Sequence, residues 1–387
     1  MSQRARHCVS CARTAVASNT SKSLHVSDYW AHLARDHIQW LSGGFGLGFS
    51  DTGLNRVSTQ MTNTETMKTL RFGIEIEVVG LSKDQIARAV ADATGGRLQG
   101  GSYYGDHQIV DTQERTWKVV HDGSLSGAQN GEIVSPVLTY EDIDLLQSIV
   151  RAVRAAGGRS DSSCGIHIHV DGTSLDAKAI KNLTKMVAKQ ERYIEQALGI
   201  ADNRLRRYCR PVNDEVLDAF DSAHELSTLR RAWYRTLGGS ATRYDNSRYH
   251  GVNLNSLFFR GTVEFRWFAF SSSKLHAGEV KAYVQFVLAL VAAAKNKRGA
   301  SRSRREYSAE SAKYDFRVFL LGLGLIGDEF KTARHHLLHR LPGSAAWKRG
   351  RPTPAPVPAT AADDPDQTHD GTDDSGDGSP SPVPHAA

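Results

Sequence analysis

The sequence predicts an α+β fold in which a twisted antiparallel sheet carries helices on one face. Four strand-like segments each alternate apolar residues with reactive polar ones, so each would present one apolar face and one polar face. Three longer segments carry apolar residues at helical spacing instead. A sheet packed on helices through its apolar side, with its polar side open to a ligand, satisfies both patterns.

The three helical segments supply the predicted apolar layer. Residues 141–156 carry an apolar stripe and are followed by Gly157, a helix stop signal. Ser174 is expected to cap a long second helix that runs to about Leu198, and residues 276–295 form the third. We interpret all three stripes as core rather than as cofactor sites.

The first strand-like segment, residues 71–79 (RFGIEIEVV), places Glu75 and Glu77 together on one face. Residues two apart on a strand lie roughly 6.5–7 Å apart. Two carboxylates at that spacing repel each other unless cations lie beside them, so the pair indicates a metal site. The alternative is an exposed edge strand on which water screens both charges.

The second segment, residues 165–170 (GIHIHV), places His167 and His169 on a shared face. A single histidine there would be read as a core residue, but two of them beside a glycine indicate a metal or phosphate site. Cys164 has the opposite strand parity. Zinc is therefore less favoured than a histidine that assists Mg²⁺ or Mn²⁺.

Two later segments repeat the design. Residues 261–268 (GTVEFRWF) place Glu264 and Arg266 on one face, and residues 252–256 (VNLNS), read as a strand, do the same for Asn253 and Asn255. The alternative for Glu264 and Arg266 is an ion pair on a hydrated sheet surface. Four strands with the same design make an accidental polar face a poor explanation.

A predicted hairpin adds two carboxylates to this face. Residues 117–120 and 131–136 read as its strands, and the turn between them begins with the sequence HDGSL at residues 121–125. The hairpin would bring Asp122 and Glu132 near the other polar residues, although Asp122 is equally interpreted as an ordinary turn residue. Such a face suits divalent cations that hold a polyphosphate, which points to phosphoryl transfer.

Composition sets the broader limits. The chain has 387 residues, 40% of them hydrophobic, and a formal net charge of +6, so it can bury a large core and is mildly basic. The charge leaves a nucleic-acid partner open, but phosphate-binding enzymes and basic linkers carry the same charge. No signal-peptide-like stretch and no apolar run of membrane-spanning length is apparent. We interpret the protein as cytoplasmic, with no membrane partner.

The chain divides into four predicted zones: a possible small zinc-binding module at residues 1–42, a flexible linker at 43–68, a catalytic domain at 69–341 and a disordered tail at 342–387. The first zone contains Cys8, Cys11, His32 and His37, which could form a Cys₂His₂ zinc site. The gap between Cys11 and His32 is longer than in common zinc fingers. The alternative is an N-terminus with surface histidines.

The motifs, in order, resemble the amidoligase family, which belongs to the carboxylate–amine ligases with a glutamine synthetase-like catalytic domain. The resemblance covers residues 70–295. It is carried by the sequences FGIEIE, DGSL, GEIVSP, SCGIHIHV, YC, NLNSL and GTVEFR. It implies a twisted antiparallel sheet packed against helices, with ATP and Mg²⁺ or Mn²⁺ on the open face.

The resemblance also implies roles for single residues. Glu75 and Glu77 would face different metals, and Glu132, His167 and Glu264 would be further ligands. Arg266 would face the phosphate. His169 would contact substrate or phosphate and, with Arg266 and Asp122, forms our catalytic set. The expected contacts to nucleotide or substrate are Arg266, Arg207, Arg210, Asn253 and Asn255.

The implied reaction has two steps, in which ATP phosphorylates a substrate carboxylate and an amine then displaces phosphate to give an amide. Both substrates could be small molecules, peptides or proteins, and the sequence does not name them. One alternative is another phosphotransferase on the same fold, although phosphagen kinases hold ATP mainly with arginines. A second is a non-catalytic adaptor that uses the N-terminal module.

Overall fold

A computed structural model of the chain describes residues 61–101 and 105–349. The predicted zinc ligands Cys8, Cys11, His32 and His37 lie outside these residues, as do most of the predicted linker and tail. Helix α2 (Asn63–Thr69) begins inside the segment predicted as a linker, where Thr62 and Glu65 form a reciprocal capping box.

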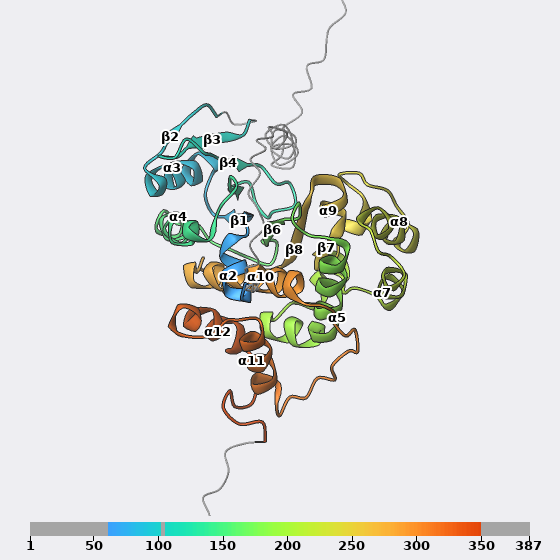
Figure 1. Ribbon diagram of the computed structural model, residues 1–387. Coiled ribbons are helices and arrows are strands. Elements are labelled where there is room, and N and C mark those ends of the chain that lie inside the picture. The colour runs from blue at the N-terminus through green and yellow to red at the C-terminus, as the bar shows by residue number, and fades with distance from the viewer. Residues whose placement is uncertain (1–60, 102–104, 350–387) are drawn as a thin grey trace, which may run out of the picture. The chain divides into compact units, whose positions relative to one another are not determined.

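One antiparallel sheet forms the centre of the fold, so the predicted α+β class is confirmed (Figure 1). Within the described residues it has eight strands, which lie in the order β2-β3-β4-β5-β1-β6-β8-β7. Their bounds are β1 (Phe72–Val79), β2 (Arg97–Leu98), β3 (His107–Val110), β4 (Thr116–Val120), β5 (Asn130–Val134), β6 (Ile166–Asp171), β7 (Val252–Asn253) and β8 (Thr262–Phe268). The predicted hairpin is confirmed, because β4 pairs with β5.

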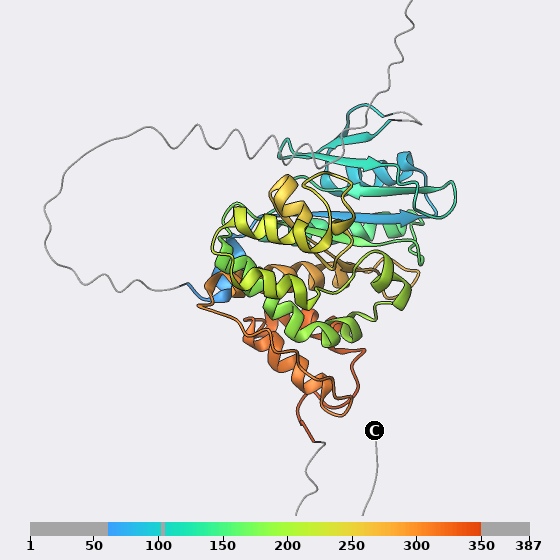
Figure 2. The same ribbon diagram turned by 90° about the vertical axis from the view of Figure 1, so that its right-hand side faces the viewer.

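Helices cover the apolar face of this sheet, as predicted. Helix α3 packs on β3, β4 and β5, α10 packs on β6, and α4 contacts both helices. Beyond α10 lie α12 and then α11, which Figures 1 and 2 show on the side of α10 away from the sheet. The remaining helix bounds are α3 (Lys83–Thr94), α4 (Ile143–Ala155), α5 (Ala177–Leu198), α6 (Asp202–Arg207), α7 (Asp214–Asp221), α8 (Leu226–Leu237), α9 (Leu254–Arg260), α10 (Ala277–Asn296), α11 (Ala312–Gly322) and α12 (Lys331–Leu338).

Helix α10 is the central core helix. It is long and apolar enough to cross a membrane by length and composition, but 89% of its most apolar window is buried inside the fold. It contacts α2, α4, α5, α12 and β6. A helix that is apolar all round is expected at such a position, because every face of it meets other protein.

Two local predictions were wrong. Ser174 does not cap α5; Asp176 does, with its carboxylate accepting a hydrogen bond from the Ala179 amide at 2.7 Å. Residues 252–256 are not one strand, because β7 ends at Asn253 and α9 starts at Leu254. The Asn253 side chain accepts from the Ser256 amide at 3.2 Å and so caps α9, which is the role asparagine prefers over a place in a strand.

We expect the core around α10 to dominate stability. Leu288 is 0% exposed, so Leu288→Ala should lower the free energy of unfolding by about 2–5 kcal/mol through lost burial and a residual cavity. Urea denaturation of the full chain measures this. Val318→Ala, at a residue 45% exposed, is the control and should change stability by less than about 0.5 kcal/mol. Equal effects would contradict the assigned core.

Candidate active site

The polar face is built around β1, which lies between β5 and β6 in the sheet. Ile74, Ile76 and Val78 point into the core, which leaves Glu75 and Glu77 on the opposite face. Cross-strand register then fixes their neighbours: Glu77 lies opposite Glu132 of β5, and Glu75 lies opposite His167 of β6. Directly opposed residues have close side chains, so the register itself places two carboxylates side by side.

Both histidines of β6 contact Glu75. His167 Nδ1 lies 3.2 Å from Glu75 Oε2, and His169 Nε2 lies 3.5 Å from Glu75 Oε1. The other nitrogen of His169, Nδ1, lies 3.1 Å from the Thr262 hydroxyl. His169 Nε2 is buried, and beyond its contact with Glu75 it makes no hydrogen bond to a described residue, so it is available to a cation that Glu75 also binds.

The glycine that precedes these histidines has a steric role. The Gly165 amide donates a hydrogen bond to Glu77 Oε2. A methyl group on Gly165 would lie 3.0 Å from Arg204 Nη2 and 3.4 Å from Glu77 Oε2. The missing side chain therefore lets a guanidinium and a carboxylate approach the backbone at the edge of the site.

Strand β8 contributes the ion pair that the sequence placed there. Arg266 Nη1 donates to Glu264 Oε1, and Asn253 Nδ2 donates to Glu264 Oε2 at 2.6 Å. Glu264 also lies opposite His169 in the register of β6 and β8. Arg266 is further held by the Tyr208 carbonyl oxygen, which accepts from its Nε at 3.3 Å. Glu264 is thus tied both to the basic side of the site and to the histidines.

Three groups of potential metal ligands overlap along this face. In each group, one ligand atom per residue lies within 4.8 Å of the others. The groups are Glu77, Asp122 and Glu132; Glu75, Glu132 and His167; and Glu75, His169 and Glu264. Because Glu75 and Glu132 each belong to two groups, neighbouring cations would share carboxylate ligands, as hard divalent cations often do.

The electrostatics of the four glutamates divide the face in two. Burial raises the pKa of Glu132 well above its ordinary value, and the charges of Glu75 and Glu77 add to this. Burial also raises the pKa of Glu77. Burial acts in the same direction on Glu75 and Glu264, but it is outweighed by His169 and His167 at Glu75, whose pKa falls well below its ordinary value, and by Arg266 at Glu264, whose pKa falls to about 2.

The donor set fits hard divalent cations. Carboxylate oxygens with one or two imidazole nitrogens suit Mg²⁺ or Mn²⁺, whereas a structural zinc site would use thiolates or more histidines. The described cysteines do not take part, since Cys164 and Cys209 are buried and belong to none of the ligand groups. The end of the face around Glu77 and Glu132 has the strongest need for a cation, because burial disfavours both ionised carboxylates there.

A cavity of about 510 Å³ lies over these residues and is basic on its other side. Its lining includes Arg266 and a further set of arginines from α6, α9 and the segment before β7: Arg204, Arg207, Arg243, Arg248 and Arg260. Arg248 lies over two rings of the lining, 5.3 Å from the centre of Tyr244 and 4.7 Å from that of Tyr249. We call the carboxylates and histidines of the three ligand groups the carboxylate floor of the cavity, and this further set of arginines, with the tyrosines beside them, its arginine wall.

The predicted site residues are mostly, but not all, at this cavity. Glu75, Glu77, Asp122, Glu132, His167, Asn253, Glu264, Arg207 and Arg266 line it. Asn255 also lines it, but its amide is engaged by the Tyr234 hydroxyl at 2.5 Å and the Thr242 carbonyl at 3.0 Å. His169 is not in the lining, and neither is Arg210, which instead donates to the backbone carbonyls of Asn246 and Tyr249.

Sequence reasoning missed Arg204, Arg243, Arg248 and Arg260. Each comes from a short helix or an irregular segment, where no period identifies a face. The available signals were the cluster of arginines from Arg204 to Arg210 and the density of arginine and tyrosine between residues 243 and 249.

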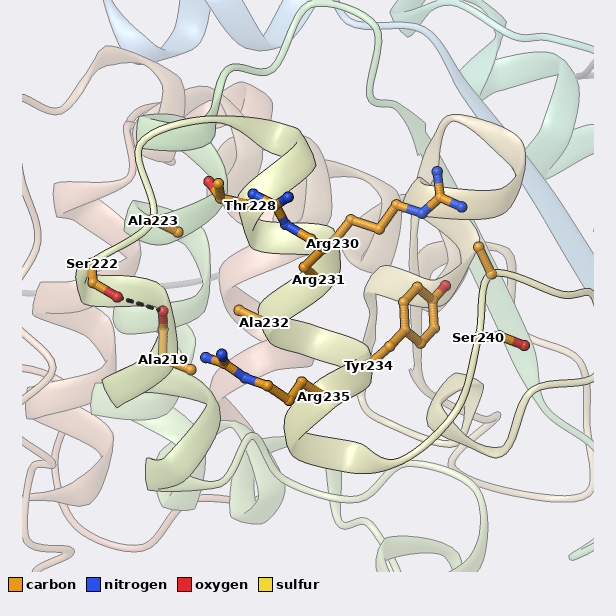
Figure 3. Close-up of a pocket in the computed structure, with 11 residues that line it drawn as sticks. Ala219, Ser222, Ala223, Thr228, Arg230, Arg231, Ala232, Tyr234, Arg235 and Ser240 are labelled. Carbon is orange, nitrogen blue, oxygen red and sulfur yellow. Dashed lines mark hydrogen bonds between the residues drawn. The ribbon is translucent and has the colours of Figure 1, made fainter.

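A second cavity, of about 630 Å³, contains no predicted site residue (Figure 3). It lies beside α7 and α8, and its lining includes Arg230, Arg231, Tyr234 and Arg235 of α8. None of the carboxylates described above is in its lining.

Comparison with known families shows which family the chain belongs to. A family model described as "Putative amidoligase enzyme" matches residues 68–291. The chain belongs to this amidoligase family. The matched residues include every strand of the sheet and the whole carboxylate floor of the cavity, so the resemblance seen in the motifs is confirmed.

Comparisons with individual proteins add little to this amidoligase. No curated protein matches the chain. One solved structure that matches is a bifunctional glutathione synthetase from Pasteurella multocida, with 12% identity and a TM-score of 0.35. That alignment covers 70% of this chain but 47% of the other. A likeness at this level carries no weight for function.

The raised pKa of Glu132 leads to a prediction about metal-free protein. Ionising Glu132 costs more in the folded protein than in the unfolded chain, so the cost is absent below the ordinary carboxyl pKa and grows as pH rises above it. Glu132→Gln should therefore raise the melting temperature at pH 8 without divalent cations, by about 2–4 °C for each kcal/mol relieved. The difference should shrink toward pH 4.

The same melting experiment tests the metal assignment. Mn²⁺ should raise the melting temperature of the wild type more than that of Glu132→Gln, because the variant lacks a shared ligand. Glu141→Gln, at an exposed surface position, is the control and should respond to Mn²⁺ as the wild type does. If Glu132→Gln melts below the wild type at pH 8 in metal-free buffer, ionised Glu132 does not destabilise the fold and the assigned repulsion from Glu75 and Glu77 is wrong.

Proposed function

We propose that this amidoligase is an ATP-dependent carboxylate–amine ligase that uses Mg²⁺ or Mn²⁺ and forms an amide or peptide bond through an acyl phosphate. The observation that supports this most is the composition of one cavity, in which the overlapping carboxylate and histidine groups face several arginines. Carboxylates and histidines hold cations, and arginines hold phosphate or carboxylate oxygens.

The residues of the floor hold and space the cations. Glu75, Glu132 and His167 form the central position, with the other two ligand groups on either side. Bound Mg²⁺–ATP or Mn²⁺–ATP supplies the phosphoryl group and neutralises its charge. The protein contributes preorganised positions, since the floor residues come from paired strands whose register fixes them before any ligand arrives.

Arg266 faces the transferring group. Its guanidinium is oriented by Glu264 and by the Tyr208 carbonyl, and burial does not neutralise it, because Glu264 keeps its pKa raised. A positioned cation of this kind stabilises negative charge that develops on phosphoryl oxygens in the transition state. His169 is held by Thr262 and does not line the cavity, so it would act through a cation that it shares with Glu75 and Glu264.

In the first step a substrate carboxylate oxygen attacks the γ-phosphorus, and the bond from that phosphorus to the bridging oxygen of ADP breaks. In the second step the amine nitrogen attacks the acyl carbon, phosphate leaves with the carbon–oxygen electron pair, and the nitrogen loses a proton. Neither step needs a protein nucleophile. Asp122 lines the cavity at its acidic end, where it can interact with the incoming ammonium group or with a cation.

Two other functions compete with this one. A phosphotransferase of another kind would use the same floor, but it would transfer phosphate to an acceptor without amide formation. A non-catalytic adaptor would not need the carboxylate groups, whose mutual repulsion destabilises the fold unless a cation relieves it. The presence of that repulsive arrangement favours a cation-dependent site.

Nucleotide binding tests the site first. ATP should bind the full-length protein in the presence of Mg²⁺ or Mn²⁺, and Glu75→Gln should weaken this by more than about tenfold, because two ligand groups lose a member. Isothermal titration measures both, with Glu141→Gln as the matched control. A wild-type protein that binds ATP with neither cation would contradict the proposal.

Turnover tests the role of Arg266. Arg266→Gln should lower kcat for phosphate release from ATP about 100- to 1,000-fold, as expected when one preorganised donor to a transition state is removed. Arg151→Gln, at an exposed position on α4, should leave kcat unchanged. If the kcat of Arg266→Gln is within about threefold of the wild-type value, Arg266 does not stabilise the transition state.

The acyl phosphate can be trapped chemically. With carboxylates screened in turn, hydroxylamine should replace the amine and give a hydroxamate, and amines should stimulate phosphate release. ATP turnover that no amine stimulates, with no hydroxamate from any carboxylate, would instead support the phosphotransferase.

A further inference from the structure

We infer that the α8 groove, defined as the cavity lined by Arg230, Arg231, Tyr234 and Arg235, binds an acidic stretch of a peptide or protein whose carboxylate reacts in the neighbouring active site. The inference rests on the proposed ligase function, because that function is what makes the bound peptide a substrate. It adds that the substrate is a polymer with several carboxylates rather than a free amino acid.

The charge of the groove is the first argument. Its lining holds three arginines and no aspartate or glutamate, and the other members are small or hydroxyl-bearing: Ala219, Ser222, Ala223, Thr228, Ala232, Ser240 and Ala241. Arg230, Arg231 and Arg235 are exposed and make no ion pair with any described residue. Elsewhere arginines such as Arg71, Arg115 and Arg304 pair with nearby carboxylates.

The acidic residues of α7 do not neutralise the groove. Asp218 and Asp221 lie on the same helix as Ala219, but they pair with Arg302 and Lys185. Asp214, at the start of α7, pairs with Arg304. These three carboxylates of α7 are paired with other cations, and Glu225, at the start of α8, accepts from the Ser227 hydroxyl at 3.2 Å. No described carboxylate forms an ion pair with the three arginines, so their charge is available to a partner.

The second argument is continuity with the active site. Tyr234 forms part of the groove wall, and its hydroxyl donates to Asn255 at 2.5 Å, a residue that lines the active-site cavity. Ser240 and Ala241 line the groove, whereas Arg243 and Tyr244, two residues farther along, line the active-site cavity. A single extended chain could therefore occupy both spaces by crossing the segment around residue 242.

Helix α8 also connects the two sites mechanically. The side of α8 away from its arginines holds the active-site wall, because Trp233 Nε1 donates to Ser247 Oγ at 3.0 Å and the Trp233 ring packs on His250. Figure 3 shows the arginines and Tyr234 leaving the same short stretch of helix, with Ser240 on the facing segment. The groove and the arginine wall are thus fixed relative to each other.

A peptide fits the groove better than a nucleic acid does. Single-stranded nucleic acids are held by exposed aromatic faces as well as by charge, and the one aromatic residue in the groove, Tyr234, is 9% exposed. Guanidinium groups pair with carboxylates in a bidentate geometry, which suits glutamate and aspartate side chains. The proposed reaction consumes a carboxylate, so a chain rich in carboxylates also carries the reacting group.

Binding of a defined probe tests the groove without requiring turnover. Fluorescein-labelled deca-glutamate should bind the full-length protein by fluorescence anisotropy at low salt, and more weakly as salt is added. The triple variant Arg230→Gln/Arg231→Gln/Arg235→Gln should bind it about tenfold more weakly. None of the three residues is in the core, so the variant should melt as the wild type does.

A charge-matched control separates the groove from net charge. Arg151→Gln/Arg298→Gln/Lys331→Gln removes three exposed positive charges, from α4, from the segment after α10 and from α12. It should retain deca-glutamate binding within about twofold. If both triple variants bind deca-glutamate equally weakly, or if the wild type does not bind it at low salt, the α8 groove is not its binding site. A labelled ten-nucleotide single strand that binds more tightly than the peptide would overturn the choice of partner.

The same probe keeps this inference separate from the proposed ligase. If deca-glutamate binds through the three arginines but stimulates no ATP turnover, the groove stands and its link to the ligase reaction fails. If free glutamate stimulates turnover as well as deca-glutamate does at equal carboxylate concentration, the polymer preference is overturned while the ligase remains.

Discussion

The site depends on one electrostatic constraint, which is that buried carboxylates on one sheet face cannot all remain ionised without nearby cations. Glu77, Glu132 and Glu264 are each less than 9% exposed, and Glu75 lies among them. The histidines and Arg266 relieve the repulsion at one end of the face, where the pKa values of Glu75 and Glu264 fall. At the other end burial and the neighbouring carboxylates outweigh the attraction of His167 and Arg204 on Glu77 and of Arg266 on Glu132, and the pKa values of Glu77 and Glu132 rise.

The fold supports that constraint through strand register rather than through side-chain contacts alone. Glu75 and Glu77 lie on the central strand β1. The neighbouring strands place polar residues opposite them on the same face, Glu132 on β5 and His167 on β6. A slip of one residue in either pairing would turn the charged side chains of the slipped strand into the apolar layer. The helices beneath the sheet and the charges above it therefore specify the same alignment.

The sequence was sufficient for those parts of the molecule that have a period. Alternation in β1, β6 and β8 identified which residues share the polar face, and helical spacing identified α4, α5 and α10. It failed where local chemistry overrides a period. Asn253 begins a helix because its side chain can cap one, and Asp176 rather than Ser174 caps α5. Of the arginine wall only Arg207 was predicted, because only tertiary packing brings α6, α9 and the segment before β7 over the sheet.

The two outermost strands of the sheet have a consequence for the behaviour of the protein in concentrated solution. Both β2 and β7 are two residues long, whereas β1, near the centre, has eight. A long outer strand offers a row of unpaired amide and carbonyl groups onto which another chain can add. Here the sheet tapers at both sides, so its long, apolar central strands are kept away from any position where they could template fibrous self-association.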